Sequence, residues 1–194
     1  AWTTTPWTLP GNTSLALAAD ADYGVVEYKG DYLVLATALM DAAGLGDRPV
    51  LKVMKGKELA NAMYEPLYNP HLFNVERRRI RPGTQGIYDI QKPDPKLLYR
   101  TINADFVSME DGTGIVHIAP AFGEEDMIVG RENGLPVVQM VDEAGFFKKN
   151  VEKFAGMAIS DANNEIIRDL KERKLLLKTQ KVTHSYPFCW RCDS

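Results

Sequence analysis

The first twelve residues place four threonines, two tryptophans, two prolines and an asparagine together, which restricts the backbone that can form there. Threonine favours extended backbone because its branched Cβ restricts χ1 and packs well on a pleated surface. Pro6 and Pro10 lack the amide donor of a strand ladder, so we predict a short strand that breaks at Pro6 and turns by Gly11. Two interpretations follow: an edge strand with a proline-rich turn, which composition alone favours, or a hydroxyl-lined pocket for a small polar ligand.

The length of the chain fits one domain, or a large domain with an appendage. The chain has 194 residues, 45% of them hydrophobic, and these suffice for a buried core. A net charge of −3 argues against binding nucleic acid by bulk neutralisation of phosphates, so any such contact must be local. We find no apolar run long enough to span a membrane and no signal peptide. Because the chain starts at Ala1 without Met and stops soon after Cys192, we expect residues 1–194 to be one domain cut from a larger protein.

Hydrophobic alternation and turn residues predict a mixed α/β fold. The segments Tyr23 to Tyr28 and Tyr32 to Ala36, separated by Lys29-Gly30-Asp31, indicate a β-hairpin. Other ordered segments, most of them strands, are expected at Ser14 to Ala18, Val50 to Lys57, Thr101 to Val107, Ile115 to Pro120, Val137 to Val141 and Leu175 to Thr183. Helices are expected at Thr37 to Ala43, from Glu124 to near Gly134, and from a Ser160-Asp161 cap to about Lys174. We therefore predict a β-barrel-like core of mainly antiparallel strands with peripheral helices.

The composition changes between Tyr64 and Leu97, where prolines recur beside a basic cluster, Arg77 to Arg81. We interpret residues 64–97 as an insertion with little regular structure. The basic cluster is either a solvated loop, which is the commoner case, or a local contact for a phosphate backbone.

His117 and Asp126 are the titratable residues that draw attention in the centre of the chain. His117 lies in an apolar segment and is a general base, a steric wall or a core histidine with satisfied nitrogens, the last being commonest. Asp126 belongs to an acidic helix start, where carboxylates complement the helix dipole; facing a pocket, it would suit an ammonium group. No P-loop, Rossmann glycine pattern, nucleophile elbow or His-Glu-x-x-His helix is present, so catalysis would use water as the attacking group.

Cys189 and Cys192 form a Cys-x-x-Cys pair in the segment 184–194. A structural zinc site usually has four ligands, so this pair is half of one, and its completion requires ligands from outside the chain. Free thiols in a reducing compartment are the favoured interpretation, and we predict no metal site or cofactor within these residues.

Three motifs together resemble the isoleucyl-tRNA synthetase family. They are Trp2-Thr-Thr-Thr-Pro-Trp-Thr-Leu-Pro-Gly-Asn12, Gly112-Thr-Gly-Ile-Val-His-Ile-Ala-Pro-Ala-Phe-Gly-Glu-Glu-Asp126 and His184-Ser-Tyr-Pro-Phe-Cys-Trp-Arg-Cys192. The resemblance covers nearly the whole chain and corresponds to the editing domain inserted into that family's catalytic domain. The valyl and leucyl families carry an arginine in the threonine stretch and lack the histidine of position 117. The His-x-Gly-His and Lys-Met-Ser-Lys-Ser signatures of the synthetic site are absent.

The resemblance implies a proofreading hydrolase that deacylates Val-tRNA(Ile) and hydrolyses valyl-adenylate. One methylene separates isoleucine from valine and gives a binding pocket only about 1–3 kcal/mol of discrimination, a limit for which this family is the usual example. A second site must therefore admit valine, exclude isoleucine and hydrolyse what enters. The implied partners are the tRNA(Ile) 3′ end, valyl-adenylate and the rest of the synthetase, and no membrane is among them. The implied location is the cytoplasm.

The resemblance also implies roles for individual residues. Asp126 would hold the substrate's α-ammonium group, and Trp7 and His117 would form the wall that excludes isoleucine. Tyr186 would be a further pocket wall. The residues implied around the carbonyl, the attacking water and the terminal adenosine are Thr3, Thr4, Thr5 and Thr8, and Asn12 matches a family residue implicated in editing, so it is counted with them as catalytic. Because hydroxyl groups are poor general bases near neutral pH, we expect the threonines to position water and ester rather than attack.

Two alternatives remain at this point. The first is a non-catalytic tRNA-binding module that uses Arg77 to Arg81 and a zinc knuckle; the acidic net charge and the single cysteine pair weigh against it. The second is a freestanding trans-editing enzyme, against which the missing Met argues. We also predict weak tRNA affinity for the isolated chain, because the rest of a synthetase would hold most of the tRNA.

Overall fold

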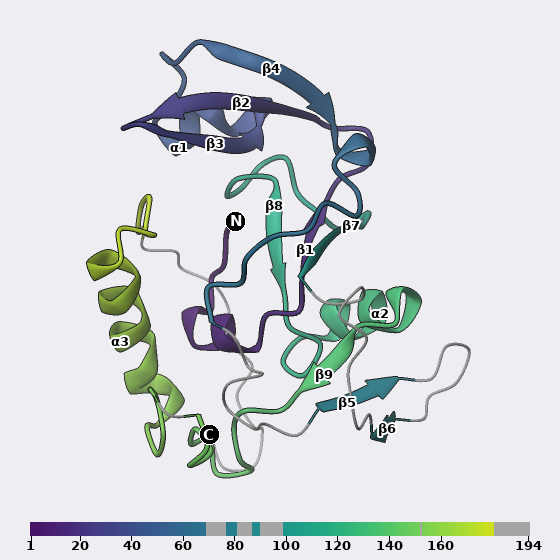
Figure 1. Ribbon diagram of the computed structural model, residues 1–194, viewed down its shortest axis with the longest axis vertical. Helices are drawn as coiled ribbons and strands as arrows, with labels where there is room; N and C mark the ends of the chain where they lie inside the picture. Colours follow the sequence, from purple (N-terminus) through teal and green to yellow (C-terminus); the bar gives the residue numbers. More distant parts are fainter. Residues whose placement is uncertain (69–76, 81–86, 90–98, 152, 181–194) are drawn as a thin grey trace.

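The computed structural model describes residues 1–68, 77–80, 87–89, 99–151 and 153–180. Its strands form three separate three-stranded sheets, ordered β7-β1-β8, β3-β2-β4 and β6-β5-β9. Figure 1 shows the second sheet at one end of the molecule and the third at the other, with the first between them. The bounds of the strands are β1 Ser14–Leu17, β2 Asp22–Tyr28, β3 Asp31–Ala36, β4 Val50–Lys55, β5 Arg77–Ile80, β6 Ile87–Asp89, β7 Arg100–Asn103, β8 Ile115–Ile118 and β9 Pro136–Val138.

The helices are short apart from two. The bounds of the α-helices are α1 Met40–Ala43, α2 Glu124–Asn133 and α3 Ile159–Glu172, and those of the 3₁₀-helices are η1 Pro6–Gly11, η2 Thr37–Leu39 and η3 Gly56–Glu58. Within the described ranges, no helix is long and apolar enough to cross a membrane.

The predicted mixed α/β class with mainly antiparallel strands is confirmed, because β1 and β7 are the only parallel pair among the named strands that the structure describes. The described strands do not close into a barrel, and this part of the prediction is wrong. The hairpin of β2 and β3 is confirmed. Lys29 and Gly30 both have positive φ, as a two-residue turn of this twist requires.

Three local predictions fail. The opening stretch makes a single bridge, from Trp2 to Val116, before η1, so it is not a strand. Helix α3 begins at Ile159, and its N-cap is Ala158 without a side-chain hydrogen bond, so Ser160-Asp161 is not the cap. No strand forms between residues 175 and 180, and the rest of the predicted last strand lies outside the described residues. Strands β5 and β6 lie within residues 64–97, and β5 pairs with β9, which is remote in sequence. Most of this segment is outside the described residues, so its predicted irregularity stays a prediction.

The largest core cluster holds α3 against η1. Buried Ile166 and Leu170 of α3 pack in one cluster with Leu9 of η1, together with Phe147 and Phe154. Burying each of these large apolar side chains contributes about 1.5–3 kcal/mol. This packing fixes η1, and with it the threonines that precede it, against the rest of the molecule.

Candidate functional site

The candidate site lies where the N-terminal stretch meets strand β8. Trp2 runs parallel to β8: its amide donates to the Ile115 carbonyl at 2.8 Å, and its own carbonyl accepts from the His117 amide at 3.4 Å. The threonines follow directly, and Pro6 then starts η1. On the other side of β8, strand β1 pairs Leu15 with His117. The backbone thus brings the threonines beside His117, although more than a hundred residues separate them in sequence.

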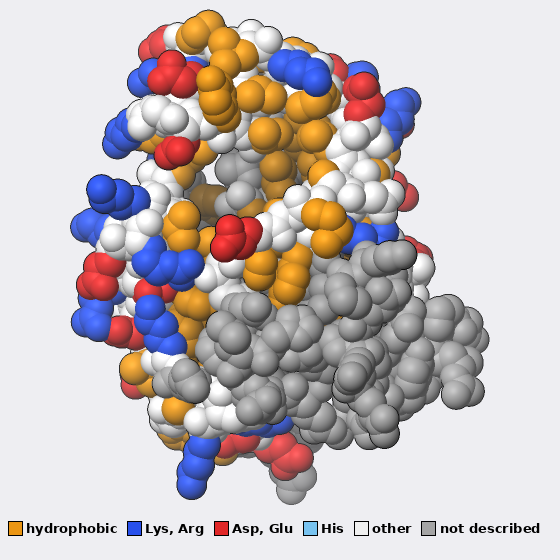
Figure 2. All heavy atoms as spheres, in the orientation of Figure 1, with side chains coloured by type: hydrophobic (Ala, Val, Ile, Leu, Met, Phe, Trp, Pro, Cys, Tyr) orange, Lys and Arg blue, Asp and Glu red, His pale blue; other side chains and the backbone are white. Residues whose placement is uncertain are grey.

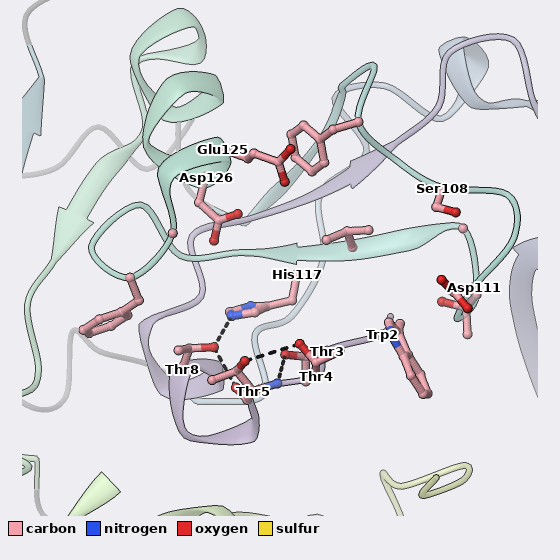
Figure 3. Close-up of a pocket in the computed structure, with 16 residues that line it drawn as sticks. Trp2, Thr3, Thr4, Thr5, Thr8, Ser108, Asp111, His117, Glu125 and Asp126 are labelled. Carbon is pink, nitrogen blue, oxygen red and sulfur yellow. Dashed lines mark hydrogen bonds between the residues drawn. The ribbon is translucent and has the colours of Figure 1, made fainter. Parts of the chain in front are cut away.

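A cavity of about 360 Å³ opens at this junction. Six of the predicted site residues line it together, namely Thr3, Thr4, Thr5, Thr8, His117 and Asp126. Figure 3 shows the threonines below the ring of His117 and the carboxylates of Glu125 and Asp126 above the β8 ribbon. In the space-filling view, this face of the molecule is hollowed below the β2-β3-β4 sheet, near the N-terminus marked in Figure 1 (Figure 2).

His117 is a neutral histidine with a single tautomer. The side-chain amide nitrogen of Asn12 lies 2.9 Å from Nδ1, and because an amide NH₂ only donates, Nδ1 must be the acceptor. The proton therefore sits on Nε2 and is donated to Thr8 Oγ1 at 3.0 Å. The ring is only 6% exposed, and burial lowers the pKa of His117 to about 3.

This geometry decides between the three interpretations of His117. With Nδ1 accepting and Nε2 protonated, the imidazole has no lone pair to offer a water molecule, so it is not a general base. It is a core histidine with both nitrogens satisfied, and its ring also lines the cavity as a fixed wall.

The threonine hydroxyls differ in what they can offer to a ligand. Thr8 accepts from His117 and donates to the Thr5 carbonyl at 2.8 Å, so its proton is already used. Thr3 Oγ1 accepts the Thr5 amide at 3.0 Å and keeps its own proton for another acceptor. Thr4 and Thr5 share only a 3.4 Å contact between their hydroxyls. The donors available to a bound carbonyl or water are therefore the hydroxyl of Thr3 and whichever of the Thr4 and Thr5 hydroxyls does not donate to the other.

Asp126 lies in the first turn of α2 and lines the end of the cavity that this helix forms. Its Oδ2 accepts the backbone N–H of Ala119 at 2.8 Å. Among the described residues, Oδ1 has no hydrogen-bond donor, so it can accept from a ligand. Burial raises the pKa of Asp126, the Ala119 hydrogen bond opposes this shift, and neighbouring Glu125 adds to it. A cationic ligand group would favour the ionised form and lower this pKa again.

Several cavity residues were missed by the sequence predictions. They are Trp2, Phe106, Ser108, Asp111, Thr113, Phe122 and Glu125. A signal for some of them lies in Gly112-Thr-Gly114, since both glycines have positive φ. A Cβ on Gly112 would lie 2.5 Å from Cγ of Trp2, so the glycine lets this loop close onto the indole.

Two predicted site residues lie elsewhere, and the position of a third is outside the described residues. Asn12 is behind His117 and does not line the cavity; its amide donates to Ser14 O at 2.7 Å as well as to the imidazole. Trp7 also lies outside the lining: its ring packs edge-on against Phe122 at 4.8 Å between centroids, and Phe122 in turn lines the cavity. Tyr186 lies outside the described residues.

The described part of the structure does not include the cysteine pair on which the zinc prediction depends. Cys189 and Cys192 lie outside the described residues. Within the part that the structure describes, no three His, Cys, Asp or Glu side chains cluster as a metal site would require.

Known proteins resemble this chain in sequence and in fold. No family model matches the sequence. The chain is 41% identical over 195 residues to isoleucine–tRNA ligase of Dehalococcoides mccartyi, an alignment that covers 100% of this chain and 18% of that protein. It is 40% identical over 197 residues to the Clostridium tetani enzyme, covering 100% and 17%, and 42% identical over 196 residues to that of Thermotoga petrophila, covering 98% and 19%. The chain therefore spans less than a fifth of these curated relatives.

Solved structures show the same fold. GlLeuRS-CP1, from a leucyl-tRNA synthetase, matches with a TM-score of 0.63 and 14% identity over 95% of this chain and 82% of that one. The editing domain of the P. falciparum cytosolic leucyl-tRNA synthetase matches with a TM-score of 0.55 and 11% identity, over 88% and 75%. The fold is that of the CP1 editing domains of aminoacyl-tRNA synthetases. The sequence relatives are more specific than the fold. The chain is homologous over its whole length to a segment of isoleucine–tRNA ligases, and this confirms the resemblance found in the motifs.

Proposed function

We propose that the chain is a proofreading hydrolase that deacylates Val-tRNA(Ile) and also hydrolyses valyl-adenylate. The observation that carries this proposal is one cavity that joins free threonine hydroxyls, a fixed neutral imidazole and a carboxylate with an unused oxygen. The sequence relationship to isoleucine–tRNA ligases supports the choice of amino acid and tRNA. The proposed partners are the tRNA(Ile) 3′ end and the remainder of the synthetase.

Asp126 would bind the substrate's amino group. A free aminoacyl ester carries an α-ammonium, and Oδ1 of Asp126 can accept a charge-assisted hydrogen bond from it while Oδ2 stays on Ala119. Such a bond contributes about 1.5–3 kcal/mol in a partly buried site. It would hold the aminoacyl end of the substrate near the α2 end of the cavity, with its ester toward the threonines.

His117 would set the size of the side chain that fits. Its ring is held by Asn12 at one nitrogen and Thr8 at the other, so it does not turn aside for an extra methylene. A wall of this kind excludes isoleucine by steric overlap. The discrimination is therefore not limited by the small free energy that one methylene contributes to binding.

The threonines would orient water and the ester. Hydroxyl groups have pKa values far above 7, so they do not remove a proton from water efficiently. Donation from Thr3, Thr4 or Thr5 to the ester carbonyl would stabilise the negative charge that develops when water attacks. The bond that forms joins the water oxygen to the carbonyl carbon. The bond that breaks is the ester bond, and it releases valine and the tRNA 3′-terminal hydroxyl.

The test is a single-turnover deacylation assay with excess 194-residue chain, using Val-tRNA(Ile) and Ile-tRNA(Ile) as parallel substrates. We expect release of valine well above the spontaneous rate and release of isoleucine at close to that rate. A filter-binding titration of tRNA(Ile) across salt concentrations accompanies it. Tight, salt-dependent binding without hydrolysis of either substrate would overturn the proposal in favour of a tRNA-binding module.

A further inference from the structure

Tyr64 lies behind the candidate site and ends in a hydroxyl group that points at Asn12. It follows η3 in sequence, and its amide donates to the Tyr99 carbonyl at 2.8 Å, which anchors its backbone. Its ring packs edge-on against that of Tyr99, with 6.0 Å between centroids. Its hydroxyl lies 2.5 Å from Asn12 Oδ1. Tyr64 does not line the cavity, so any influence on a ligand must pass through other residues.

The orientation of the Asn12 amide is fixed from both ends. Its nitrogen faces the carbonyl oxygen of Ser14 at 2.7 Å, which accepts only, so this end must be the NH₂ group. Its oxygen faces the Tyr64 hydroxyl, which must then be the donor. Burial raises the pKa of Tyr64, so the phenol keeps its proton and remains a donor throughout the neutral range.

The hydrogen bonds continue in one direction from this point. Asn12 donates to Nδ1 of His117, Nε2 of His117 donates to Thr8, and Thr8 donates to the Thr5 carbonyl. Each proton position follows from the one before it, and this series of hydrogen bonds begins at the Tyr64 hydroxyl, which donates to Asn12. Reversing the Asn12 amide would place its oxygen against Nδ1 and favour the other tautomer of His117.

We infer that Tyr64 is a positioning residue, which locks the Asn12 amide and thereby the Nε2–H tautomer and ring orientation of the His117 wall. The consequence for selectivity between valine and isoleucine rests on the proposed function; the consequence for the tautomer does not. Loss of the phenol removes the donor that holds Asn12 Oδ1, so the amide turns more easily and the ring of His117 loses its fixed partner.

The variant that tests this is Tyr64→Phe, which keeps the ring and its packing. Its matched control is Tyr68→Phe, which removes another buried phenol hydrogen bond, the 2.6 Å bond to Asp169, at a residue that does not line the cavity and makes no contact with His117 that the structure records. Both variants lose a hydroxyl group and some stability. Only Tyr64→Phe should change His117.

The first measurement is the long-range ¹H–¹⁵N spectrum of the histidine rings, of which the chain has three. The His117 signals are assigned by their loss in His117→Gln. We expect the pure Nε2–H pattern in the unmodified chain and in Tyr68→Phe, and a detectable minor Nδ1–H population in Tyr64→Phe, where the Ser14 carbonyl still opposes reversal of the Asn12 amide. An unchanged Nε2–H pattern in Tyr64→Phe overturns the inference.

The second measurement is the ratio of Val-tRNA(Ile) to Ile-tRNA(Ile) deacylation rates. Since one neutral hydrogen bond is at stake, we expect Tyr64→Phe to lower this ratio by roughly 5- to 10-fold, while Tyr68→Phe leaves it unchanged. Equal ratios in the two variants would contradict the selectivity part. If the unmodified chain hydrolyses neither substrate, the proposed function fails while the ring spectrum still decides the role of Tyr64.

Discussion

The backbone amide of Ala119 donates to Oδ2 of Asp126 at 2.8 Å, so the end of strand β8 holds the carboxylate of helix α2 in place. Strand β8 also carries His117. The proposed ammonium-binding group and the proposed wall are thus spaced by one continuous stretch of backbone. A carboxylate held in this way keeps one oxygen for a ligand without having to reorganise.

Removing the charge of Asp126 while keeping its shape should separate binding from folding. In Asp126→Asn, the amide oxygen still accepts from Ala119, but the group no longer attracts an ammonium. We expect kcat/KM for Val-tRNA(Ile) deacylation to fall roughly 10- to 100-fold, as loss of one charge-assisted hydrogen bond predicts. The control is Glu124→Gln, an exposed neighbour on the same helical turn that does not line the cavity, and it should keep full activity. Full activity in Asp126→Asn would rule out the ammonium role.

The same variant should be more stable than the unmodified chain at neutral pH. Because burial raises the pKa of Asp126 above 3.8, ionisation is less favourable in the folded state than in the unfolded state. This cost is absent at low pH, builds up as the pH rises through the folded pKa and persists above it. Thermal unfolding midpoints of the two proteins should therefore coincide near about pH 3 and diverge at pH 7, with the variant higher. A lower midpoint for the variant at pH 7 would show that the carboxylate stabilises the fold instead.

That the threonines, His117 and Asp126 lie around one cavity could be expected from the sequence, because each stands in one of the motifs that carry the family resemblance. The roles of Asn12 and Trp7 could not. Asn12 is oriented by Tyr64, and the Trp7 amide donates to Asn163 at 2.9 Å, a partner 156 residues away that no local pattern reveals.

The fold shows the same division between local and remote determinants. The β2–β3 hairpin was predictable because its turn needs Lys29 and Gly30 with positive φ, a property of the local sequence. Strand β5 was not, since its partner β9 lies in a distant part of the chain. The barrel was a wrong extrapolation from strand content: the number and spacing of strands do not reveal which of them pair, and here they divide into three sheets.

Truncating the histidine wall should broaden the range of side chains that enter. In His117→Ala, the cavity gains the volume of an imidazole, so the extra methylene of isoleucine no longer clashes with the ring. We expect Ile-tRNA(Ile) deacylation to rise by roughly 10- to 100-fold. Asn12 and Thr8 each lose a partner, so the free energy of unfolding should also fall by about 1–3 kcal/mol.

The control for that loss of stability is Ile118→Val, at the next position of β8 and fully buried. It should cost about 0.5–1.5 kcal/mol without changing the ratio of valine to isoleucine hydrolysis. If His117→Ala still leaves Ile-tRNA(Ile) untouched, the wall lies elsewhere in the cavity.

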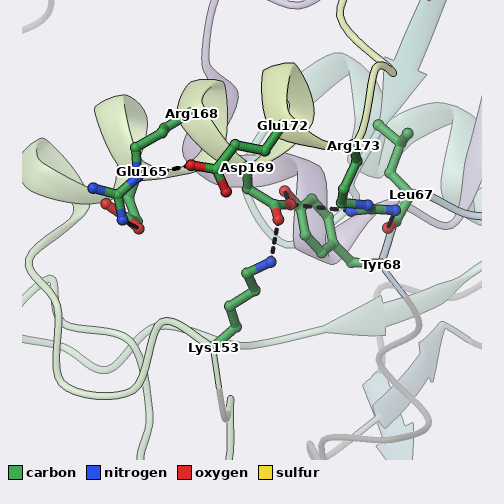
Figure 4. Close-up of polar contacts among 8 residues, drawn as sticks. All are labelled: Leu67, Tyr68, Lys153, Glu165, Arg168, Asp169, Glu172 and Arg173. Atoms are coloured by element: carbon green, nitrogen blue, oxygen red, sulfur yellow. Dashed lines mark hydrogen bonds and ion pairs between the residues drawn. The ribbon is translucent and has the colours of Figure 1, made fainter.

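A buried carboxylate that the site does not use holds helix α3 in place. Asp169, 4% exposed, accepts hydrogen bonds from Tyr68 at 2.6 Å, from Arg173 at 3.0 Å and from Lys153 (Figure 4). Burial alone would raise the pKa of Asp169, but the hydrogen bonds from Lys153, Tyr68 and Arg173 outweigh it and lower the pKa below 3.8. The ionised Asp169 therefore stabilises the fold fully above pH 3.8, the pKa of the unfolded state, and this stabilisation is lost as the pH falls through the lower pKa of the folded state.

Asp169→Asn should lose about 2 kcal/mol of unfolding free energy at pH 7, because hydrogen bonds to a charged acceptor are replaced by weaker ones. The difference from the unmodified chain should narrow as the pH falls, since protonation removes the same charge from the native protein. Urea unfolding at pH 7 and in acid measures both effects. Glu172→Gln is the control on the same helix: its 3.8 Å pair with Arg168 is exposed on both sides and should contribute no more than about 0.5 kcal/mol. Equal losses in the two variants would mean that the buried cluster stabilises α3 no more than a surface ion pair does.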